Sequence, residues 1–221
     1  MILTINNRTT IVFDLDDTLY NEVDFLKSAY RLIAKKLEPE LKKNIYREML
    51  GLYKSRKSTF DVIFEKYNPS ISIDDMISLY RYHKPILKPA DGVKNLLAKI
   101  KKQGGRLGLL TDGRSISQRN KLDALKLKVK FDLIVISEEF GSEKPAMRNY
   151  KIFEEKLKAE TYIYIGDNIK KDFVSPNKLG WETICLLDNG YNIHYQDWNL
   201  NLEYLPKYKI TSFNNLLNCI N

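Results

Sequence analysis

Cysteine and histidine are both scarce in this chain of 221 residues, with two of each. Cys185 and Cys219 cannot build a disulfide framework, and neither the cysteines nor the histidines stand at the spacing of a zinc site. We therefore expect two reduced thiols and no zinc centre.

Long apolar runs are missing as well. No stretch of about 18 consecutive apolar residues occurs, so no membrane span is expected. The opening residues, MILTINNRTTIVF, lack the basic flank, the apolar stretch and the cleavage site of a secretory signal. The sequence thus predicts a cytoplasmic protein without a membrane partner.

Basic charge, in contrast, is in excess. The chain contains 36 Lys and Arg against 28 Asp and Glu, which gives a net charge of +8. Such an excess suits nucleic acid, an anionic small substrate, or solubility alone. Most basic residues lie in patterns typical of amphipathic helices, where lysines take the solvent-facing side. We therefore expect no nucleic-acid partner.

The pattern of secondary structure divides the chain into two kinds of region. A β-branched and aromatic strand is predicted at 10–15, and helical periodicity follows it. After a linker at 83–93 that contains proline and glycine, helices and strands alternate, and a helix closes the chain. The other predicted helices are 25–37, 44–56, 58–67, 72–84, 91–104, 115–127, 149–159 and 171–180, and the other predicted strands are 106–113, 131–141, 161–168, 181–189 and 207–211.

Such alternation is typical of an α/β fold with a doubly wound, mostly parallel (Rossmann-like) sheet. The first four helices interrupt it, so we expect an inserted helical cap at 20–84 and an α/β core made of 1–19 and 85–221. Ligands of such sheets bind beyond the carboxyl ends of the strands, and a cap that leaves from that edge can act as a lid. Segment 191–204 fits no element.

Acidic residues crowd the end of the first predicted strand. In TIVFDLDDTLYNE, Asp14, Asp16 and Asp17 fall within four positions. Residues two apart in an extended chain lie roughly 6–7 Å from each other on the same side. One of Asp14 and Asp16 can therefore attack a substrate while the other transfers a proton, although a turn or a helix cap would explain such a pair on its own.

Three later strand ends carry matching groups. Strand 161–168 ends in Asp167, with Asp172 five residues on, and so many carboxylates repel one another unless a cation such as Mg²⁺ lies among them. Thr111 can donate a hydrogen bond to an anionic oxygen, and Lys144 can hold a transferring group. A nucleophile, an acid–base, a hydroxyl, a cation and a metal site are the parts that phosphoryl transfer needs. The proline that follows Lys144 suits the first turn of the next helix.

These motifs resemble those of the haloacid dehalogenase-like (HAD) hydrolase superfamily, in a phosphatase-type member with a helical cap inserted after the first motif. The similarity spans about 10–188. Its first motif is Asp14-Leu15-Asp16-Asp17-Thr18, its second centres on Thr111, its third on Lys144, and its fourth is Gly166-Asp167 followed by Asp172.

The resemblance implies a role for each matching residue. Asp14 would attack phosphorus and form an aspartyl-phosphate, while Asp16 would protonate the leaving oxygen and then activate water. The presence of Asp16 favours phosphate esters over alkyl halides, because a halide leaves without a proton. The phosphoryl oxygens would be bound by Thr111, Asp112 and Lys144. Mg²⁺ would be held by Asp14, the main-chain carbonyl of Asp16, Asp167 and Asp172, the last directly or through water.

Two motif residues, Asp112 and Thr18, have no catalytic role assigned by the resemblance. Asp112 stands where many relatives carry Asn, so it either meets the substrate or faces outward in a turn. Thr18 is expected to cap the turn after the first motif. Tyr20 and Asn21, just past that motif, are expected to line the entrance of the site, whereas neither His83 nor His194 is expected to be a ligand.

We expect a Mg²⁺-dependent phosphatase that acts on a small phosphorylated metabolite, such as a sugar phosphate or a nucleotide, as a monomer or homodimer. A phosphomutase of the same superfamily is the first alternative. A phospho-accepting signalling domain is a second, although the order of the acidic motifs and the helical insertion argue against it.

Overall fold

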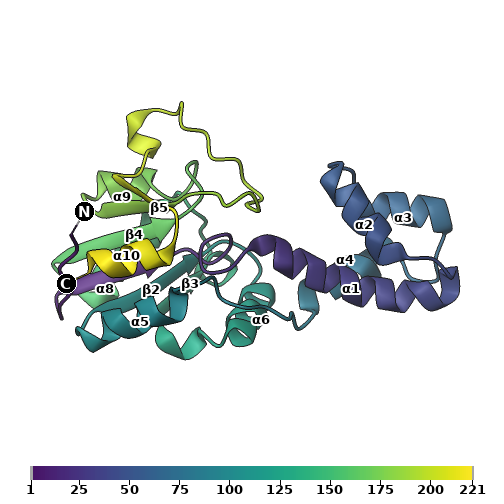
Figure 1. Ribbon diagram of the computed structural model, residues 1–221, viewed down its shortest axis with the longest axis horizontal. Coiled ribbons are helices and arrows are strands. Elements are labelled where there is room, and N and C mark those ends of the chain that lie inside the picture. The colour runs from purple at the N-terminus through teal and green to yellow at the C-terminus, as the bar shows by residue number, and fades with distance from the viewer. Residues whose placement is uncertain (1, 221) are drawn as a thin grey trace.

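A six-stranded parallel sheet forms the centre of the molecule (Figure 1), which we describe from a computed structural model that covers residues 2–220. The strands are β1 (Thr9–Phe13), β2 (Arg106–Thr111), β3 (Leu133–Ile136), β4 (Thr161–Gly166), β5 (Glu182–Leu186) and β6 (Tyr208–Ile210). Their spatial order is β3-β2-β1-β4-β5-β6, and each neighbouring pair is parallel. This confirms the α/β fold that the alternation of elements predicts.

The central strand β1 is buried along its whole length. Because successive side chains of a strand point to opposite faces, Ile11 and Phe13 pack into one apolar cluster and Val12 into the other. A strand covered on both faces needs a nearly continuous apolar run, which the residues TIVF supply. The same strand carries the acidic cluster at its carboxyl end.

Helices cover both faces of the sheet, as expected of a doubly wound fold. One face is covered by α5 (Val93–Lys102), α6 (Ser115–Leu125) and α10 (Phe213–Cys219), the other by α8 (Arg148–Leu157) and α9 (Val174–Lys178). Short connecting elements are η1 (Lys128–Lys130), α7 (Ser137–Phe140) and η2 (Leu202–Tyr204).

Two local predictions around β3 are wrong. The strand predicted at 131–141 ends at Ile136, and α7 begins at the next residue, because Glu138 and Glu139 face solvent and Gly141 closes the short helix in the left-handed region at φ 68°. Pro145 does not lie in the first turn of the next helix, since α8 begins at Arg148.

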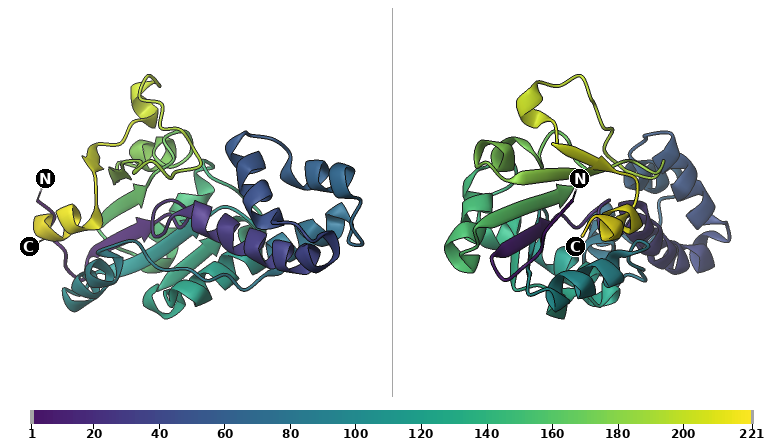
Figure 2. Two further views of the ribbon diagram at one scale, coloured as in Figure 1. Left: turned by 45° about the vertical axis from the view of Figure 1, so that its right-hand side comes forward. Right: turned by 60° about the vertical axis from the view of Figure 1, so that its left-hand side comes forward.

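Four helices form a lobe beyond the carboxyl ends of the strands (Figure 2). They are α1 (Glu22–Leu41), α2 (Ile45–Lys54), α3 (Thr59–Tyr67) and α4 (Ile73–Tyr82). The lobe has an apolar core of its own, centred on Ile33, Leu37, Met49, Ile63 and Met76. We keep 20–84 as the proposed extent of this cap, and 1–19 with 85–221 as that of the core.

None of the helices within residues 2–220 combines the length and the apolar character needed to cross a membrane.

Candidate active site

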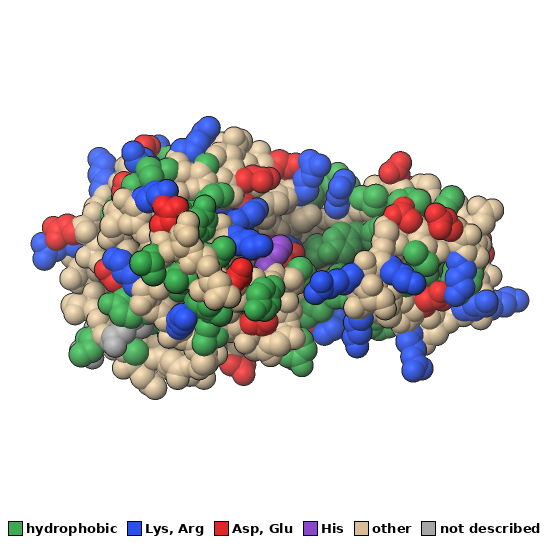
Figure 3. Space-filling model, turned by 90° about the horizontal axis from the view of Figure 1, so that it is seen from above, with side chains coloured by type: hydrophobic (Ala, Val, Ile, Leu, Met, Phe, Trp, Pro, Cys, Tyr) green, Lys and Arg blue, Asp and Glu red, His purple; other side chains and the backbone are tan. Residues whose placement is uncertain are grey.

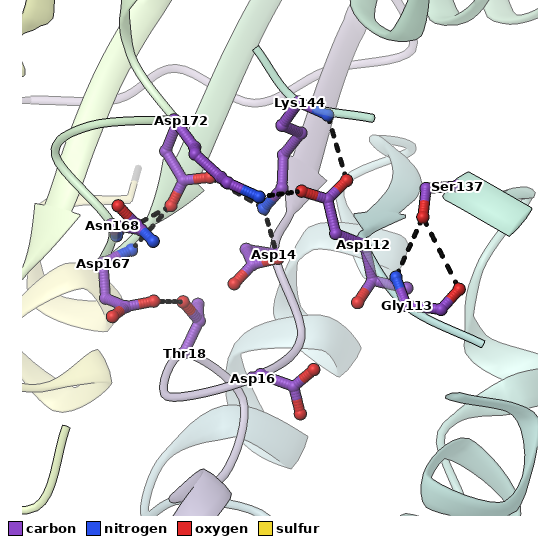
Figure 4. A network of polar contacts seen from close by, with 12 residues as sticks. Asp14, Asp16, Thr18, Asp112, Gly113, Ser137, Lys144, Asp167, Asn168 and Asp172 are labelled. Carbon is purple, nitrogen blue, oxygen red and sulfur yellow. Dashed lines mark hydrogen bonds and ion pairs between the residues drawn. The ribbon is translucent and has the colours of Figure 1, made fainter. Parts of the chain in front are cut away.

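The predicted motifs converge at the carboxyl edge of the sheet (Figure 4). Asp14 follows β1 directly, and Asp167 follows β4, the strand that pairs with β1. Lys144 reaches in from the segment before α8, with its Nζ 2.6 Å from Oδ1 of Asp14 and 2.7 Å from Oδ1 of Asp172. One buried lysine thus bridges two buried carboxylates.

The residues present fit a divalent metal ion. Asp14, Asp167 and Asp172 are buried, and each offers a carboxylate oxygen within 4.8 Å of the others. Burial raises the pKa of Asp14 to about 7, with the charge of Asp172 adding to the effect and Lys144 opposing it. Burial, then the charges of Asp14 and Asp172, also raise the pKa of Asp167 well above its usual value. This cluster of oxygen donors, with too little positive charge of its own, suits a hard cation.

Asp172 is held by four donors. Its Oδ2 accepts the main-chain N–H groups of Asp167 (3.1 Å) and Asn168 (2.8 Å), and its Oδ1 accepts from Lys144 and, at 3.2 Å, from the hydroxyl of Tyr164. Gly166 makes this arrangement fit, because a Cβ atom there would lie 2.3 Å from Oδ2 of Asp172. The fourth motif therefore needs its glycine for space.

Asp16 has a different set of partners. Its carboxylate accepts from the hydroxyl of Tyr20, from Nε2 of Gln118 at 2.8 Å and from Nζ of Lys121 at 2.7 Å. Burial works to raise the pKa of Asp16, but the charge of Lys121 and these hydrogen bonds outweigh it and leave the pKa lowered. Lys121 is itself buried and lies over the ring of Phe25, 4.5 Å from its centroid. Sequence reasoning missed both α6 residues, Gln118 and Lys121.

The second motif, Thr111 and Asp112, contacts the third, which centres on Lys144. The hydroxyl of Thr111, at the end of β2, accepts a hydrogen bond from Gln118 at 2.5 Å. Asp112 accepts the main-chain N–H of Lys144 (3.0 Å) on one oxygen and Nζ of Lys171 (3.0 Å) on the other. Both carboxylate oxygens of Asp112 therefore have partners. Phosphate binding by Asp112 stays a prediction, and the group that would bind the phosphate is its main-chain N–H.

Three residues of the first motif and its flank lie elsewhere than expected. The hydroxyl of Thr18 donates to Oδ1 of Asp167 at 3.1 Å rather than to the turn that follows it. Tyr20 does not line an entrance, because it is fully buried against Asp16. Asn21 bonds to Asn189 at 3.1 Å beside a separate hollow.

The uninterpreted tail forms one wall of the site. Asn192 donates to Oδ2 of Asp167 at 2.9 Å, the N–H of Ile193 donates to Oδ2 of Asp17 at 2.7 Å, and His194 lines the cavity. No local sequence pattern could have predicted these contacts, because about 25 and 176 residues separate the partners.

The resulting cavity has a volume of about 120 Å³, enough for about four waters at about 30 Å³ each. It adjoins a groove of about 400 Å³ that lies between the core and the cap and shares Asp16, Glu22 and Asp112 with it. Figure 3 shows this hollow, with hydrophobic side chains in its floor. The site thus combines a small polar chamber with room for a larger group outside.

A Rossmann-like sheet with these four motifs at its strand ends defines a hydrolase of the haloacid dehalogenase type. The chain belongs to the haloacid dehalogenase-like hydrolase family, whose model matches residues 11–186, and it is an enzyme of the phosphatase class. It is 32% identical over 212 residues to a Methanocaldococcus jannaschii protein named glyceraldehyde 3-phosphate phosphatase, a match that covers 86% of this chain and 92% of that protein.

Further relatives agree with this assignment. A Methanopyrus kandleri protein of the same name is 30% identical, over 82% of this chain and 84% of its own length. Among solved structures, the HAD-hydrolase YfnB of Bacillus subtilis has the same fold, with a TM-score of 0.69 and 20% identity over 96% of this chain and 98% of YfnB.

Proposed function

We propose that the protein is a Mg²⁺-dependent phosphatase that hydrolyses a small phosphomonoester through an aspartyl-phosphate on Asp14. The observation that carries the proposal is Lys144, which bridges Asp14 and Asp172 beside Asp167. The two relatives named above make glyceraldehyde 3-phosphate the first candidate substrate. Cytoplasmic location, the lack of a nucleic-acid partner, and a monomeric or homodimeric state stay predictions.

In the first half of the reaction, a carboxylate oxygen of Asp14 attacks phosphorus and the bond from phosphorus to the ester oxygen breaks. Lys144 holds Oδ1 of Asp14, so the other oxygen is the nucleophile. The leaving oxygen takes its proton from Asp16, which must enter this step in its protonated form and leaves it as the carboxylate that pairs with Lys121, 2.7 Å away. The neutral alcohol then departs into the groove.

In the second half, Asp16 removes a proton from water, whose oxygen attacks phosphorus. The bond between phosphorus and Asp14 breaks, phosphate leaves, and the Asp14 carboxylate is restored. The ion pair with Lys121 favours the charged form of Asp16 that this step needs. Thr111 and Lys144 would hold the phosphoryl oxygens throughout.

The carboxylates of Asp14 and Asp167 and the main-chain carbonyl of Asp16 would hold Mg²⁺. The ion would neutralise charge on the phosphoryl oxygens. Asp172 already accepts four hydrogen bonds, so we propose that it contributes through water and by orienting Lys144.

The test is phosphate release with Mg²⁺ from glyceraldehyde 3-phosphate and from p-nitrophenyl phosphate. Asp14→Asn should lose at least about 10³-fold in kcat on both, because the nucleophile is gone. Asp16→Asn should lower kcat/KM for glyceraldehyde 3-phosphate by about 10²–10⁴-fold, but that for p-nitrophenyl phosphate far less, since p-nitrophenolate leaves without a proton.

Asp123→Asn, an exposed carboxylate on α6, serves as the control and should behave as the wild type. Turnover by Asp14→Asn at the wild-type rate would rule out the aspartyl-phosphate.

A further inference from the structure

The catalytic cavity has a buried base and a more exposed rim. Its base is made by residues that are at most 6% exposed: Asp14, Thr111, Lys144 and Asp167. Two further lining residues are more accessible, since Glu22 is half-buried and His194 is exposed. If the base binds the phosphoryl group, as proposed above, the leaving group must project past this rim.

A single carboxylate fixes both sides of the rim. Oδ1 of Asp17 accepts the N–H of Glu22 at 2.7 Å, and Oδ2 accepts the N–H of Ile193, also at 2.7 Å. Asp17 therefore ties the first residue of α1 to the tail segment, and His194 follows Ile193 directly. The bond from Asn192 to Asp167 anchors the same segment a second time. The main chain at Glu22 and next to His194 is thus fixed at one opening by these contacts.

Both rim side chains have free hydrogen-bonding capacity. Within residues 2–220, no hydrogen bond or ion pair joins the Glu22 carboxyl or the His194 ring to another residue of the chain. The two lysines that line the cavity are engaged, the buried Lys144 with Asp14 and the more accessible Lys171 with Asp112. A carboxyl and an imidazole can together accept from and donate to one hydroxyl group, which is itself both donor and acceptor.

We propose that Glu22 and His194 form a subsite for a hydroxyl group on the alcohol part of the substrate. It makes the enzyme selective for phosphate esters of hydroxylated alcohols over those of plain alkyl alcohols. The inference rests on the proposed phosphatase function and specifies the substrate class of the same site. An alkyl ester would leave both polar groups without partners, which is how a hydrogen-bonding site rejects an analogue that lacks the hydroxyl.

The experiment compares kcat/KM for glycerol 3-phosphate and n-propyl phosphate, which differ in the two hydroxyl groups, with p-nitrophenyl phosphate as a third substrate. The wild type should prefer glycerol 3-phosphate by at least about tenfold. His194→Ala and Glu22→Ala should each reduce that preference about tenfold, the factor that a hydrogen bond is worth. His194→Gln, which keeps a side-chain donor, should retain most of the preference.

Tyr195→Ala is the matched control, because Tyr195 is the next residue, is 83% exposed and does not line the cavity. It should keep the wild-type preference. A preference that is unchanged in both His194→Ala and Glu22→Ala, or an equal loss on the two esters, would overturn the inference while leaving the phosphatase function intact. If the wild type with Mg²⁺ hydrolyses none of the three substrates, the proposed function fails and the subsite fails with it.

Discussion

At the scale of the residue, three neighbouring aspartates after β1 have three different environments. Asp14 meets the ammonium group of Lys144, whereas Asp16 meets Lys121 together with two uncharged donors. Asp17 accepts only main-chain N–H groups and has φ 51°, in the left-handed region. The three identical side chains thus have different partners within four positions, which suits the separate roles that we propose for Asp14 and Asp16.

Gly166 gives a test of how closely the residues around the three buried aspartates, Asp14, Asp167 and Asp172, are packed. In Gly166→Ala the added methyl group would lie 2.3 Å from Oδ2 of Asp172, which two main-chain N–H groups hold in place. We expect Asp172 to shift and kcat/KM to fall by about 10–100-fold, as for other changes beside metal ligands. Steady-state kinetics over a range of Mg²⁺ concentrations would measure the effect.

Gly51→Ala is the matched control. Gly51 lies in α2, and no atom lies within 4 Å of the place that an added methyl group would take, so alanine there should stabilise the helix by about 0.5–1 kcal/mol and leave kcat/KM unchanged. Equal activity of the two variants would show that Asp172 tolerates displacement.

The sequence could predict those site residues that follow a predicted strand, but not those that lie on a helix. The motif residues Asp14, Thr111 and Asp167 stand at strand ends, and parallel strands bring their ends to one edge, so the structure places them together as expected. Lys144 joins them from the segment between α7 and α8. Lys121 could not be found in this way, because a lysine in an amphipathic helix is normally assigned to solvent. Only the packing of α6 against the site shows that it is buried.

At the scale of the element, the sequence predicts where strands and helices lie better than where they end. All six strands occur at the predicted places, since most of them are short apolar runs between turn residues. The predicted strand at 131–141 is too long, because periodicity alone cannot separate the end of β3 from the short helix α7. The helix at 171–180 shrinks to Val174–Lys178, since the turn that positions Asp172 takes its first residues.

The start of α4 offers a prediction at this scale. Ser72 accepts the N–H of Asp75 at 3.1 Å, and the Asp75 carboxylate accepts the N–H of Ser72 at 3.0 Å, which makes a reciprocal cap. Ser72→Ala removes this capping bond and should therefore lower the free energy of unfolding of the four-helix lobe by about 1 kcal/mol. Native-state hydrogen exchange of the α4 amides would report the loss locally.

The comparison for this change is Ser55→Ala, at the end of α2. Ser55 is exposed as well, and within the described chain its hydroxyl makes no hydrogen bond, so its loss should cost less than about 0.5 kcal/mol. If Ser55→Ala lowered stability as much as Ser72→Ala, the pair of hydrogen bonds between Ser72 and Asp75 would contribute little.

At the scale of the whole molecule, the active site lies where the sheet, the cap and the tail meet. The sheet supplies the base, the cap supplies Glu22 at the start of α1, and the tail supplies His194. The cap and the core each have their own apolar cluster, and Phe25 of α1 and Tyr80 of α4 connect the two, with their ring centroids 5.4 Å apart. The carboxylates at this junction carry a large electrostatic cost that the rest of the fold must offset.

That cost leads to the last prediction, on the coupling of metal binding to stability. Mg²⁺ that binds only the folded state should stabilise the wild type by about 2.7 kcal/mol at 100 times its Kd. Asp167→Asn removes one of three buried carboxylates within 4.8 Å of one another, so this variant should be more stable than the wild type in EDTA and gain little from Mg²⁺. Urea unfolding with EDTA and with Mg²⁺ measures both quantities, and Asp123→Asn should match the wild type in each. A variant at 167 that gains as much from Mg²⁺ as the wild type would place the ion elsewhere, because stabilisation by mass action requires the ligands that bind it.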